Sequence, residues 1–355
     1  MLFKLMKQNT VTATINDKNG VCEILQEKDI PLDMFLESGE DIDTCMNNLQ
    51  NFYSWCSDRL LSLDRVYAKA ILNACGLTQS NNIRSRAYAA LQYHALTLTD
   101  FYWVQNDKEC LNWEQINLFE NSLNNAVAIA LTGKPLTVQN AMLLAPDCST
   151  AGVAPKAWIR EGDSVFLLKG NVGDSVQKEI EASQILAALG LLCVAYTRFV
   201  FQGTVTSRCA IFTDKHTALV TAEQYSFNND LSALLQMEDF RYAYHLMNLS
   251  DYLTGNIDRH RGNWGFLLSD KNEMKPAPLM DFNHAFEAVD ETPCLPEKLL
   301  GNPCSQAESA EKALAYLDSG HSDESRQLKD KMRQFDHTGF VYGGYVRQRI
   351  EKLWK

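Results

Sequence analysis

Three oxygen-bearing side chains in one short stretch of the chain have the types and spacing of a phosphotransfer centre. Asp258 and Asn263 stand five residues apart in a polar loop, and Asp281 follows at the end of a short apolar run. Phosphoryl transfer needs a carboxylate beside the attacking hydroxyl and oxygen ligands for the metal ions that neutralise a polyphosphate. Asp258 is therefore expected to accept the proton of a hydroxyl, and Asn263 and Asp281 to bind the Mg²⁺ (or Mn²⁺) of ATP.

A hairpin is expected to bring Asp281 back beside that loop. Residues 264–268 have the apolar character of a buried strand, and residues 269–273 form a polar turn. Residues 277–280 are predicted to be the returning strand, which ends at Asp281.

The same residues resemble a known kinase family. The spacing Asp-x-x-x-x-Asn is that of the protein-kinase catalytic loop, and Asp281-Phe-Asn stands where kinases have Asp-Phe-Gly. The run from Gly255 to His260, Gly-Asn-Ile-Asp-Arg-His, together with Asn263 and the later Asp-Phe, resembles the pattern of the HipA-like serine/threonine kinases. The resemblance covers residues 146–290 and implies an α+β, two-lobed protein-kinase-like fold. The alternative is that these side chains are solvated loop residues.

His260 also matches the family pattern. It would orient Asp258 or bind a phosphate oxygen of the nucleotide, and plain structural packing is the alternative.

Upstream, a loop of small residues resembles the phosphate-covering loop of that family. Ser149, Gly152 and Lys156 match its Ser-x-x-Gly-x-x-x-Lys pattern. Glycine lets backbone N–H groups approach phosphate closely and lysine supplies charge, although an ordinary turn is the alternative. The resemblance implies that Ser149, or the adjacent Thr150, becomes phosphorylated by the enzyme itself, which expels the loop and switches the enzyme off.

A lysine and a glutamate are expected to pair near the phosphates. Lys169 ends an apolar strand predicted over residues 165–169, so its stem packs on the core while its ammonium reaches into a cleft. In the helix predicted over 179–190, Glu179 lies on the apolar stripe and Glu181 faces the other way. Because a buried carboxylate needs a partner, Glu179 is predicted to bind Lys169, as in kinases. Unrelated surface charges are the alternative.

Two further strands are predicted at 208–214 and 218–226, joined by a polar turn. The resemblance places Glu223 and Tyr225 in an extended segment that presents backbone groups to adenine, with Gln224 in place of the usual arginine.

Length and composition bound the class of protein. The 355 residues permit about two domains. A net charge of −11 without a long basic run argues against a nucleic-acid-binding surface. The ten cysteines lack zinc spacing and are expected to be reduced.

No targeting segment is predicted. The first residues lack the apolar core of a secretory signal, and the longest apolar run, 185–196, falls short of the roughly 20 residues that span a bilayer. A cytoplasmic protein without a membrane span is expected, and secretion as an effector is the alternative.

Three regions are predicted along the chain. Residues 1–140 form a mostly helical N-terminal region, with a hairpin over 10–25 and helices at 45–61, 63–75, 83–97 and 113–131. Residues 141–226 form a β-rich ATP-binding lobe. Residues 227–355 form a mostly α-helical catalytic lobe, with helices at 231–253, 308–319, 324–335 and 343–354.

The sequence thus predicts an ATP-dependent serine/threonine protein kinase of the HipA-like type that acts on a protein substrate. The resemblance allows a toxin or effector role, which the sequence does not decide. An antitoxin or other regulatory partner is implied by the resemblance, although the first 130 residues do not match the family's own N-terminal subdomain. Two alternatives stay open: a small-molecule or lipid kinase on the same fold, and a nucleotide-binding regulator that no longer turns over. The intact Asp258, Asn263 and Asp281 argue against the second.

Overall fold

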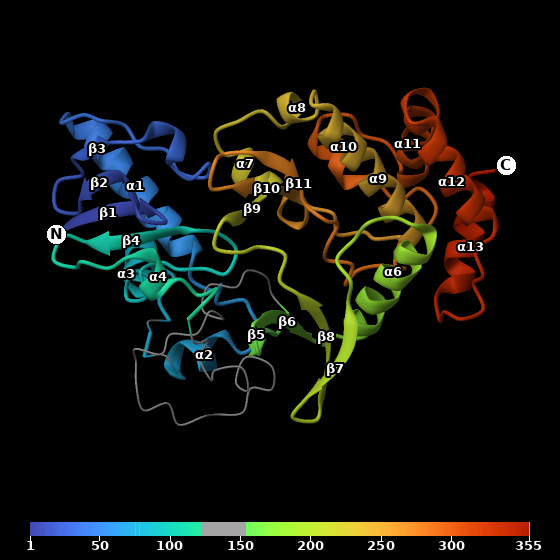
Figure 1. The fold of residues 1–355 in the computed structure, drawn as a ribbon, viewed down its shortest axis with the longest axis horizontal. Helices are drawn as coiled ribbons and strands as arrows, with labels where there is room; N and C mark the ends of the chain where they lie inside the picture. The colour runs from blue at the N-terminus through green and yellow to red at the C-terminus, as the bar shows by residue number, and fades with distance from the viewer. Residues whose placement is uncertain (75, 78, 122–153, 355) are drawn as a thin grey trace. The chain divides into compact units, whose positions relative to one another are not determined.

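The structure, a computed structural model, describes residues 1–74, 76, 77, 79–121 and 154–354 (Figure 1). It is a mixed helix and sheet fold, as the sequence predicted. The chain forms two compact units: Met1–Gly170, Val200–Leu219 and Leu267–Glu273 make the first, and Asn171–Phe199, Val220–Phe266 and Met274–Lys355 make the second. These two units do not coincide with the regions predicted at 1–140, 141–226 and 227–355, and that division stays a prediction.

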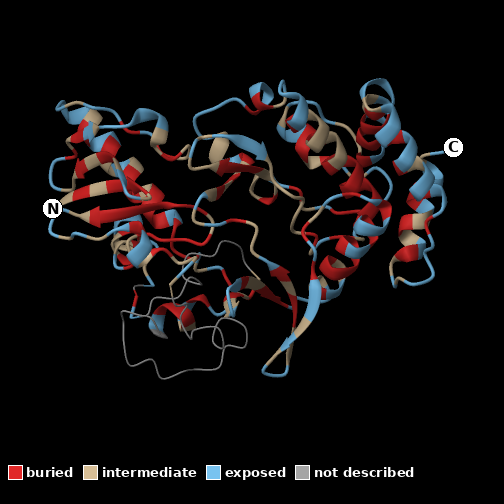
Figure 2. Cartoon of the chain, viewed as in Figure 1, coloured by how far each residue is buried: buried red, intermediate tan, exposed pale blue. Residues whose placement is uncertain are grey.

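A four-stranded antiparallel sheet occupies the N-terminal region. Its order is β3-β2-β1-β4, with β1 (Leu2–Lys7), β2 (Thr10–Asn16), β3 (Cys22–Ile24) and β4 (Tyr102–Asn106). The hairpin of β2 and β3 was predicted. Its turn requires glycine, because Gly20 has a φ of +76° and a Cβ there would lie 2.0 Å from the carbonyl oxygen of Cys45. Strands β1 and β4 were not predicted; β4 is buried at four of its five positions, so it lacks the alternation of a half-exposed strand (Figure 2).

The helices described in this region overlap the predicted ones, with other bounds. They are α1 (Ile42–Asp58), α2 (Ala68–Ala74), α3 (Ile83–Leu91) and α4 (Trp113–Ile116), with a 3₁₀ turn at Glu27–Asp29. Helices α3 and α4 begin at the predicted residues, whereas α1 begins at residue 42 instead of 45 and α2 at 68 instead of 63. The prediction that α3 reaches residue 97 is wrong, because His94 and Ala95 have φ values of +57° and +52°, which a right-handed helix excludes. The helix predicted over 113–131 ends at Ile116, and its part beyond residue 121 lies outside the described residues.

The second sheet has the order β5-β6-β8-β7, formed by β5 (Lys156–Glu161), β6 (Ser164–Gly170), β7 (Thr197–Phe201) and β8 (Thr204–Ala210). The strand, turn and strand predicted before Lys169 are confirmed as β5 and β6, and β7 was missed. In the antiparallel register of β5 and β6, Lys156 stands opposite Lys169.

A three-stranded sheet has the order β11-β10-β9, with β9 (Thr217–Thr221), β10 (Gly265–Ser269) and β11 (Met274–Pro276). The predicted turn over 269–273 is present, since the Ser269 N–H donates to the Glu273 carbonyl at 2.9 Å. The returning strand ends at Pro276, so its predicted position at 277–280 is wrong by a few residues.

Helices dominate the second unit. They are α6 (Ser175–Leu189), α7 (Ala222–Tyr225), α8 (Leu231–Leu234), α9 (Glu238–Thr254), α10 (Leu295–Leu299), α11 (Gln306–Gly320), α12 (Ser322–Arg333) and α13 (Gly343–Lys352). The single helix predicted over 231–253 is two, because Met237 has the extended backbone of a new helix start. In the parts of the chain that the structure describes, none of the helices has the length and apolar character needed to cross a membrane.

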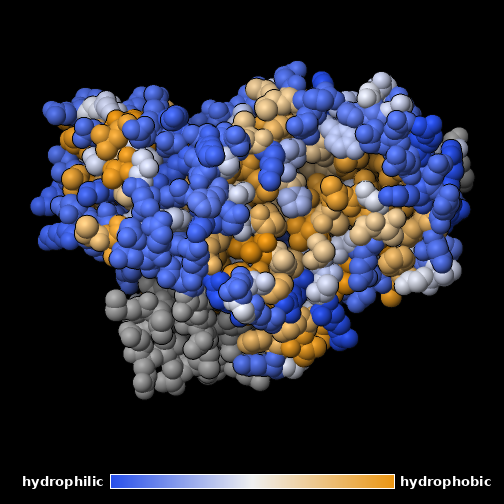
Figure 3. Space-filling model, viewed as in Figure 1, coloured by the Kyte–Doolittle hydropathy of each residue, from blue (hydrophilic) through white to orange (hydrophobic). Residues whose placement is uncertain are grey.

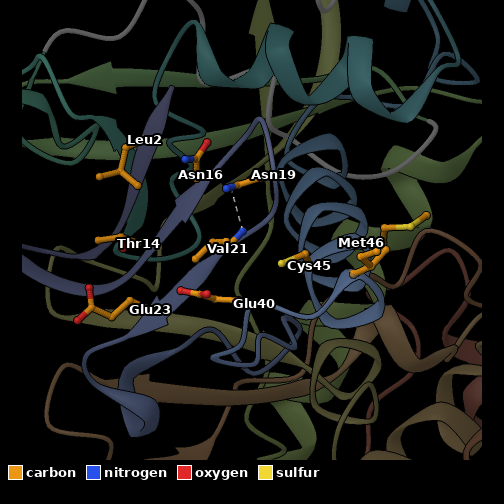
Figure 4. A pocket seen from close by; sticks show the side chains of 10 residues that line it. Leu2, Thr14, Asn16, Asn19, Val21, Glu23, Glu40, Cys45 and Met46 are labelled. Carbon is orange, nitrogen blue, oxygen red and sulfur yellow. Dashed lines mark hydrogen bonds between the residues drawn. The ribbon is translucent and has the colours of Figure 1, made fainter.

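An open groove of about 720 Å³ lies in the first unit, between its N-terminal sheet and the start of α1 (Figure 4). Cys45 and Met46 line it from the helix and Glu23 from β3. Apolar surface interrupts the polar surface over this sheet (Figure 3). Among the described residues, none that is predicted to bind nucleotide or metal lines this groove.

Candidate active site

The predicted catalytic loop starts where helix α9 ends. Gly255 terminates α9 in the left-handed conformation, with a φ of +59°. A Cβ at this position would lie 1.9 Å from the hydroxyl of Tyr345, so both the backbone and the neighbouring side chain demand glycine. The chain then runs through Asp258 into a 3₁₀ turn at Arg261–Asn263.

Arg259 anchors this loop to helix α9 through a buried ion pair with Asp251. The side chain of Arg259 is 1% exposed, and its Nε and Nη2 each donate to the Asp251 carboxylate at 2.9 Å. The side-chain amide of Asn256 donates to the same carboxylate at 3.0 Å. Burial alone would lower the pKa of the Arg259 guanidinium, but the Asp251 carboxylate outweighs it and raises that pKa. Arg259 is therefore a permanent cation that fixes the loop to the helix.

The third nitrogen of Arg259 joins the loop to the segment that carries Asp281. Its Nη1 donates to the carbonyl of Asn263 at 2.6 Å and to the carbonyl of Met280 at 2.5 Å. The guanidinium also lies 5.0 Å from the ring centre of Phe282, which is fully buried. One side chain thus brings together the backbone at Asn263 and the backbone immediately before Asp281.

Asp258 and Asn263 contact one another within the loop. The side-chain amide nitrogen of Asn263 donates to the backbone carbonyl of Asp258 at 2.9 Å, so the amide oxygen is the atom that Asn263 can offer to a cation. Asn263 is buried, whereas the Asp258 side chain is 40% exposed and open to a substrate.

His260 lies beside Asp258 with a defined orientation. Its Nδ1 accepts a hydrogen bond from the Gly262 N–H at 3.0 Å, so the proton of a neutral ring sits on Nε2. That Nε2 is 4.0 Å from the Asp258 carboxylate. A Cβ on Gly262 would lie 2.8 Å from the His260 ring and 3.3 Å from the Glu223 carboxylate. Glycine at position 262 therefore leaves the space that the His260 ring occupies.

Asp281 is held by a segment that comes from elsewhere in the second unit. Its backbone has a φ of +60°, which is uncommon for aspartate. The Asp281 N–H donates to the hydroxyl of Tyr196 at 3.2 Å, and Cys193 forms a parallel bridge with Leu279. The Tyr196 N–H in turn donates to the hydroxyl of Ser183 on α6 at 3.2 Å. Through Tyr196, hydrogen bonds thus connect α6 to Asp281. Tyr196 was not predicted as a site residue, because it belongs to no motif.

Glu179 and Glu181 both lie on α6 and both are buried. The Glu181 carboxylate accepts the backbone N–H groups of Val341 and Tyr342 at 2.7 and 2.9 Å, so it attaches the segment before α13 to α6. The expectation that Glu181 faces away from the apolar stripe missed this buried role. Glu179 is 1% exposed, which fits the predicted burial, while its pairing with Lys169 of the first unit stays a prediction.

Two predicted phosphate-binding lysines stand side by side in the first unit. Lys156 and Lys169 occupy opposite positions on β5 and β6, so their side chains leave the same face of the sheet. Lys169 is buried to 7% exposure. The remaining residues of the predicted loop, Ser149, Thr150 and Gly152, lie outside the described residues.

The segment predicted to contact adenine has a different local structure. The prediction of a strand through residue 226 is wrong beyond Thr221, because Thr221 starts the short helix α7 that contains Glu223 and Tyr225. Gln224 explains the helix start, since its side-chain oxygen accepts the Thr221 N–H at 2.9 Å in a capping box. Tyr225 packs edge-on against Phe266 of β10, with ring centres 5.5 Å apart.

Comparison with solved structures identifies the fold of this chain. No family model and no curated protein matches this sequence. The structure is similar to that of HipA from a Shewanella oneidensis MR-1 toxin–antitoxin system, solved with HipB and operator DNA. The TM-score is 0.57 at 12% identity, over 99% of this chain and 97% of that one. The Helicobacter pylori proinflammatory kinase CtkA matches with a TM-score of 0.39 at 16% identity, over 56% of this chain and 89% of its own. The near-complete alignment with HipA shows that this chain has the HipA-like, protein-kinase-like fold.

Proposed function

We propose that this protein is an ATP-dependent kinase that phosphorylates a serine or threonine hydroxyl of a protein substrate. The observation that carries the proposal is the contact of one buried guanidinium, that of Arg259, with the carbonyls of both Asn263 and Met280. It unites the two short segments whose side chains phosphoryl transfer requires. The HipA-like fold supports the same reading.

Asp258 is the group that would act on the acceptor hydroxyl. Its carboxylate is exposed enough to meet a substrate, while its backbone carbonyl is held by the Asn263 amide. A carboxylate in this position orients the hydroxyl and accepts its proton as the bond to phosphorus forms. His260 Nε2, 4.0 Å from that carboxylate, would orient it or bind a phosphate oxygen.

The residues present fit a magnesium-bound nucleotide. Asn263 has its amide oxygen left for a cation, and Asp281 supplies a carboxylate in the segment joined to the same guanidinium. The side-chain oxygen of Asn283, two residues on, is buried without a hydrogen-bond partner among the described residues. Mg²⁺ binds proteins through one or two carboxylates and takes its other ligands from phosphate and water. When bound, it would neutralise charge on the phosphates of the nucleotide, with Asn263 and Asp281 as its proposed protein ligands.

Lys156 and Lys169 would bind the phosphates from the first unit. Their side chains leave the same face of the sheet, so both ammonium groups can contribute positive charge to one anionic ligand. Glu179 would hold the Lys169 ammonium in place, and the α7 segment with Glu223 and Tyr225 would contact the base.

The experiment that tests the proposal compares Asp258→Asn with wild type. Purified protein is incubated with radiolabelled ATP, Mg²⁺ and a lysate, and label is measured separately in protein and in lipid extract. Loss of the general base should reduce protein labelling by about 10²- to 10⁴-fold, with nucleotide affinity largely retained. Asp323→Asn, which alters an exposed carboxylate on α12, is the matched control. Equal labelling by wild type and Asp258→Asn would refute the proposal, and label in the lipid fraction alone would assign a lipid acceptor.

Autophosphorylation and a protein partner belong to the same proposal. Phosphate on Ser149 or Thr150 would carry a charge of about −1.5 to −2 and be repelled by bound ATP. Mass spectrometry after incubation with Mg-ATP should therefore find phosphate on the peptide that contains them, and the Ser149→Ala, Thr150→Ala double variant should stay active longer. An unmodified peptide in active enzyme would exclude this regulation. A regulatory partner of the antitoxin kind is proposed from the fold alone, since HipA was solved with HipB.

A further inference from the structure

Two cysteines of the second unit lie opposite each other in a short antiparallel pairing. Pro293 and Ser305 form an isolated antiparallel bridge. The Cys294 N–H donates to the Cys304 carbonyl at 2.9 Å, and the Gln306 N–H donates to the Thr292 carbonyl at 2.8 Å. This register makes Cys294 and Cys304 direct partners across the pairing.

The register gives the Cα spacing at which disulfides form. Residues that face each other through a backbone hydrogen bond in an antiparallel pair have Cα atoms about 5.5 Å apart, and disulfides form between Cα atoms about 4.4–6.8 Å apart. Directly opposite residues also project their side chains to the same face. Both cysteines are free thiols in this structure.

The two thiols differ in their access to solvent. Cys304 is partly exposed, whereas Cys294 is 4% exposed and its Sγ donates to the Asn248 side-chain oxygen at 3.7 Å. Burial raises the pKa of the Cys294 thiol to about 11. An oxidant from solution therefore meets Cys304 first, and Cys294 is placed to react second.

The paired segment supports the predicted catalytic loop at two points. Between the cysteines, the carbonyl of Leu299 in α10 accepts a hydrogen bond from Arg261 Nη2 at 2.9 Å. Just after the second cysteine, the side chain of Gln306 donates to the Asn256 carbonyl at 2.6 Å. Cys294 also lines a cavity of about 10 Å³ together with Asp251 and Arg259, the ion pair that anchors the loop. A covalent bond between residues 294 and 304 would therefore constrain the wall against which the loop rests.

We propose that Cys294 and Cys304 are a redox modification site that forms a reversible disulfide and thereby controls the support of the catalytic loop. A peroxide oxidises the Cys304 thiol to a sulfenic acid and is itself reduced to water. The Cys294 sulfur then attacks the Cys304 sulfur, the S–S bond forms, and a second water leaves. A dithiol reductant reverses the reaction by thiol–disulfide exchange. The disulfide does not depend on the proposed kinase function, whereas its effect on turnover rests on it.

The first measurement follows the bond itself. The full-length protein is treated with hydrogen peroxide, alkylated, digested without reduction and analysed by mass spectrometry. We expect a linked pair of peptides containing Cys294 and Cys304, about 2 Da lighter than the two thiol peptides together, which dithiothreitol separates. Cys304→Ser should abolish the link, and Cys110→Ser, which alters an exposed cysteine of the first unit, should preserve it. Alkylation of both thiols in the peroxide-treated protein, or links to other cysteines instead, would overturn the proposal.

The second measurement follows the consequence for the loop. The linked segment contacts the loop through the Leu299 and Gln306 hydrogen bonds, and loss of one of these contacts in the disulfide form should lower transfer of label from ATP about fivefold. Dithiothreitol should restore the rate, and Cys304→Ser should be insensitive to peroxide. Unchanged transfer in fully linked protein would overturn the control of the loop. An absence of transfer in untreated wild type would count against the kinase function, and the linked peptide would still decide the modification site.

Discussion

Replacing Arg259 by methionine should be among the most destabilising single changes in the second unit. The substitution keeps the apolar stem but removes the guanidinium, which contacts both oxygens of Asp251 and the carbonyls of Asn263 and Met280. It leaves a carboxylate that is 4% exposed, to which the Asn256 amide still donates at 3.0 Å. Breaking a buried ion pair from one side costs about 3–5 kcal/mol. We therefore expect the free energy of unfolding to fall by that amount.

Urea unfolding followed by tryptophan fluorescence measures this loss, and hydrogen exchange over residues 255–263 shows whether the loop opens locally. Arg326→Met is the matched control, because Arg326 pairs with Asp323 on the surface with both side chains more than 70% exposed. Such a pair contributes about 0–1 kcal/mol. In the Arg259→Met background, a further Asp251→Asn change should cost much less than it does in wild type. Equal losses in the Arg259 and Arg326 variants, or additive losses at Arg259 and Asp251, would refute the reasoning.

Four further predictions rest on other contacts. Tyr196→Phe removes the acceptor of the Asp281 N–H and should raise the Mg²⁺ concentration for half-maximal transfer about fivefold; an unchanged Mg²⁺ dependence would argue against this positioning role. Burial and the charge of Arg241 lower the pKa of His245 to about 4, so the unfolded state binds a proton below about pH 6.5 that the folded state does not bind. Wild type should therefore lose stability as the pH falls from 6.5 to 4, and His245→Phe should lose less in urea unfolding at pH 5 compared with pH 7.5. Lys169→Ala and Glu179→Ala should impair transfer non-additively if the two side chains pair, and additive losses would separate them. Glu181→Gln, by contrast, should lower the free energy of unfolding, since Glu181 holds two backbone N–H groups.

Local signals in the sequence determined several elements in both units. Gly190 and Gly255 end their helices as left-handed caps, and glycine is the residue that adopts this conformation without strain. The strands β5 and β6 and helix α6 carry apolar patterns of the expected period, so their positions were predictable. The spacing of Asp258 and Asn263 is likewise a local property, because both lie in one turn of chain.

The tertiary structure alone decided which polar residues organise the site. Arg259 lies in the predicted motif, but its partner Asp251 lies eight residues earlier, in the last turn of α9. Its contact with the Met280 carbonyl spans 21 residues. Tyr196 reaches Asp281 across 85 residues, and Glu181 reaches Val341 across 160. Strand β4 pairs with β1 from about a hundred residues away. No periodic pattern encodes such pairings, because they depend on where separate segments meet after folding, and a buried charge acquires its partner only there.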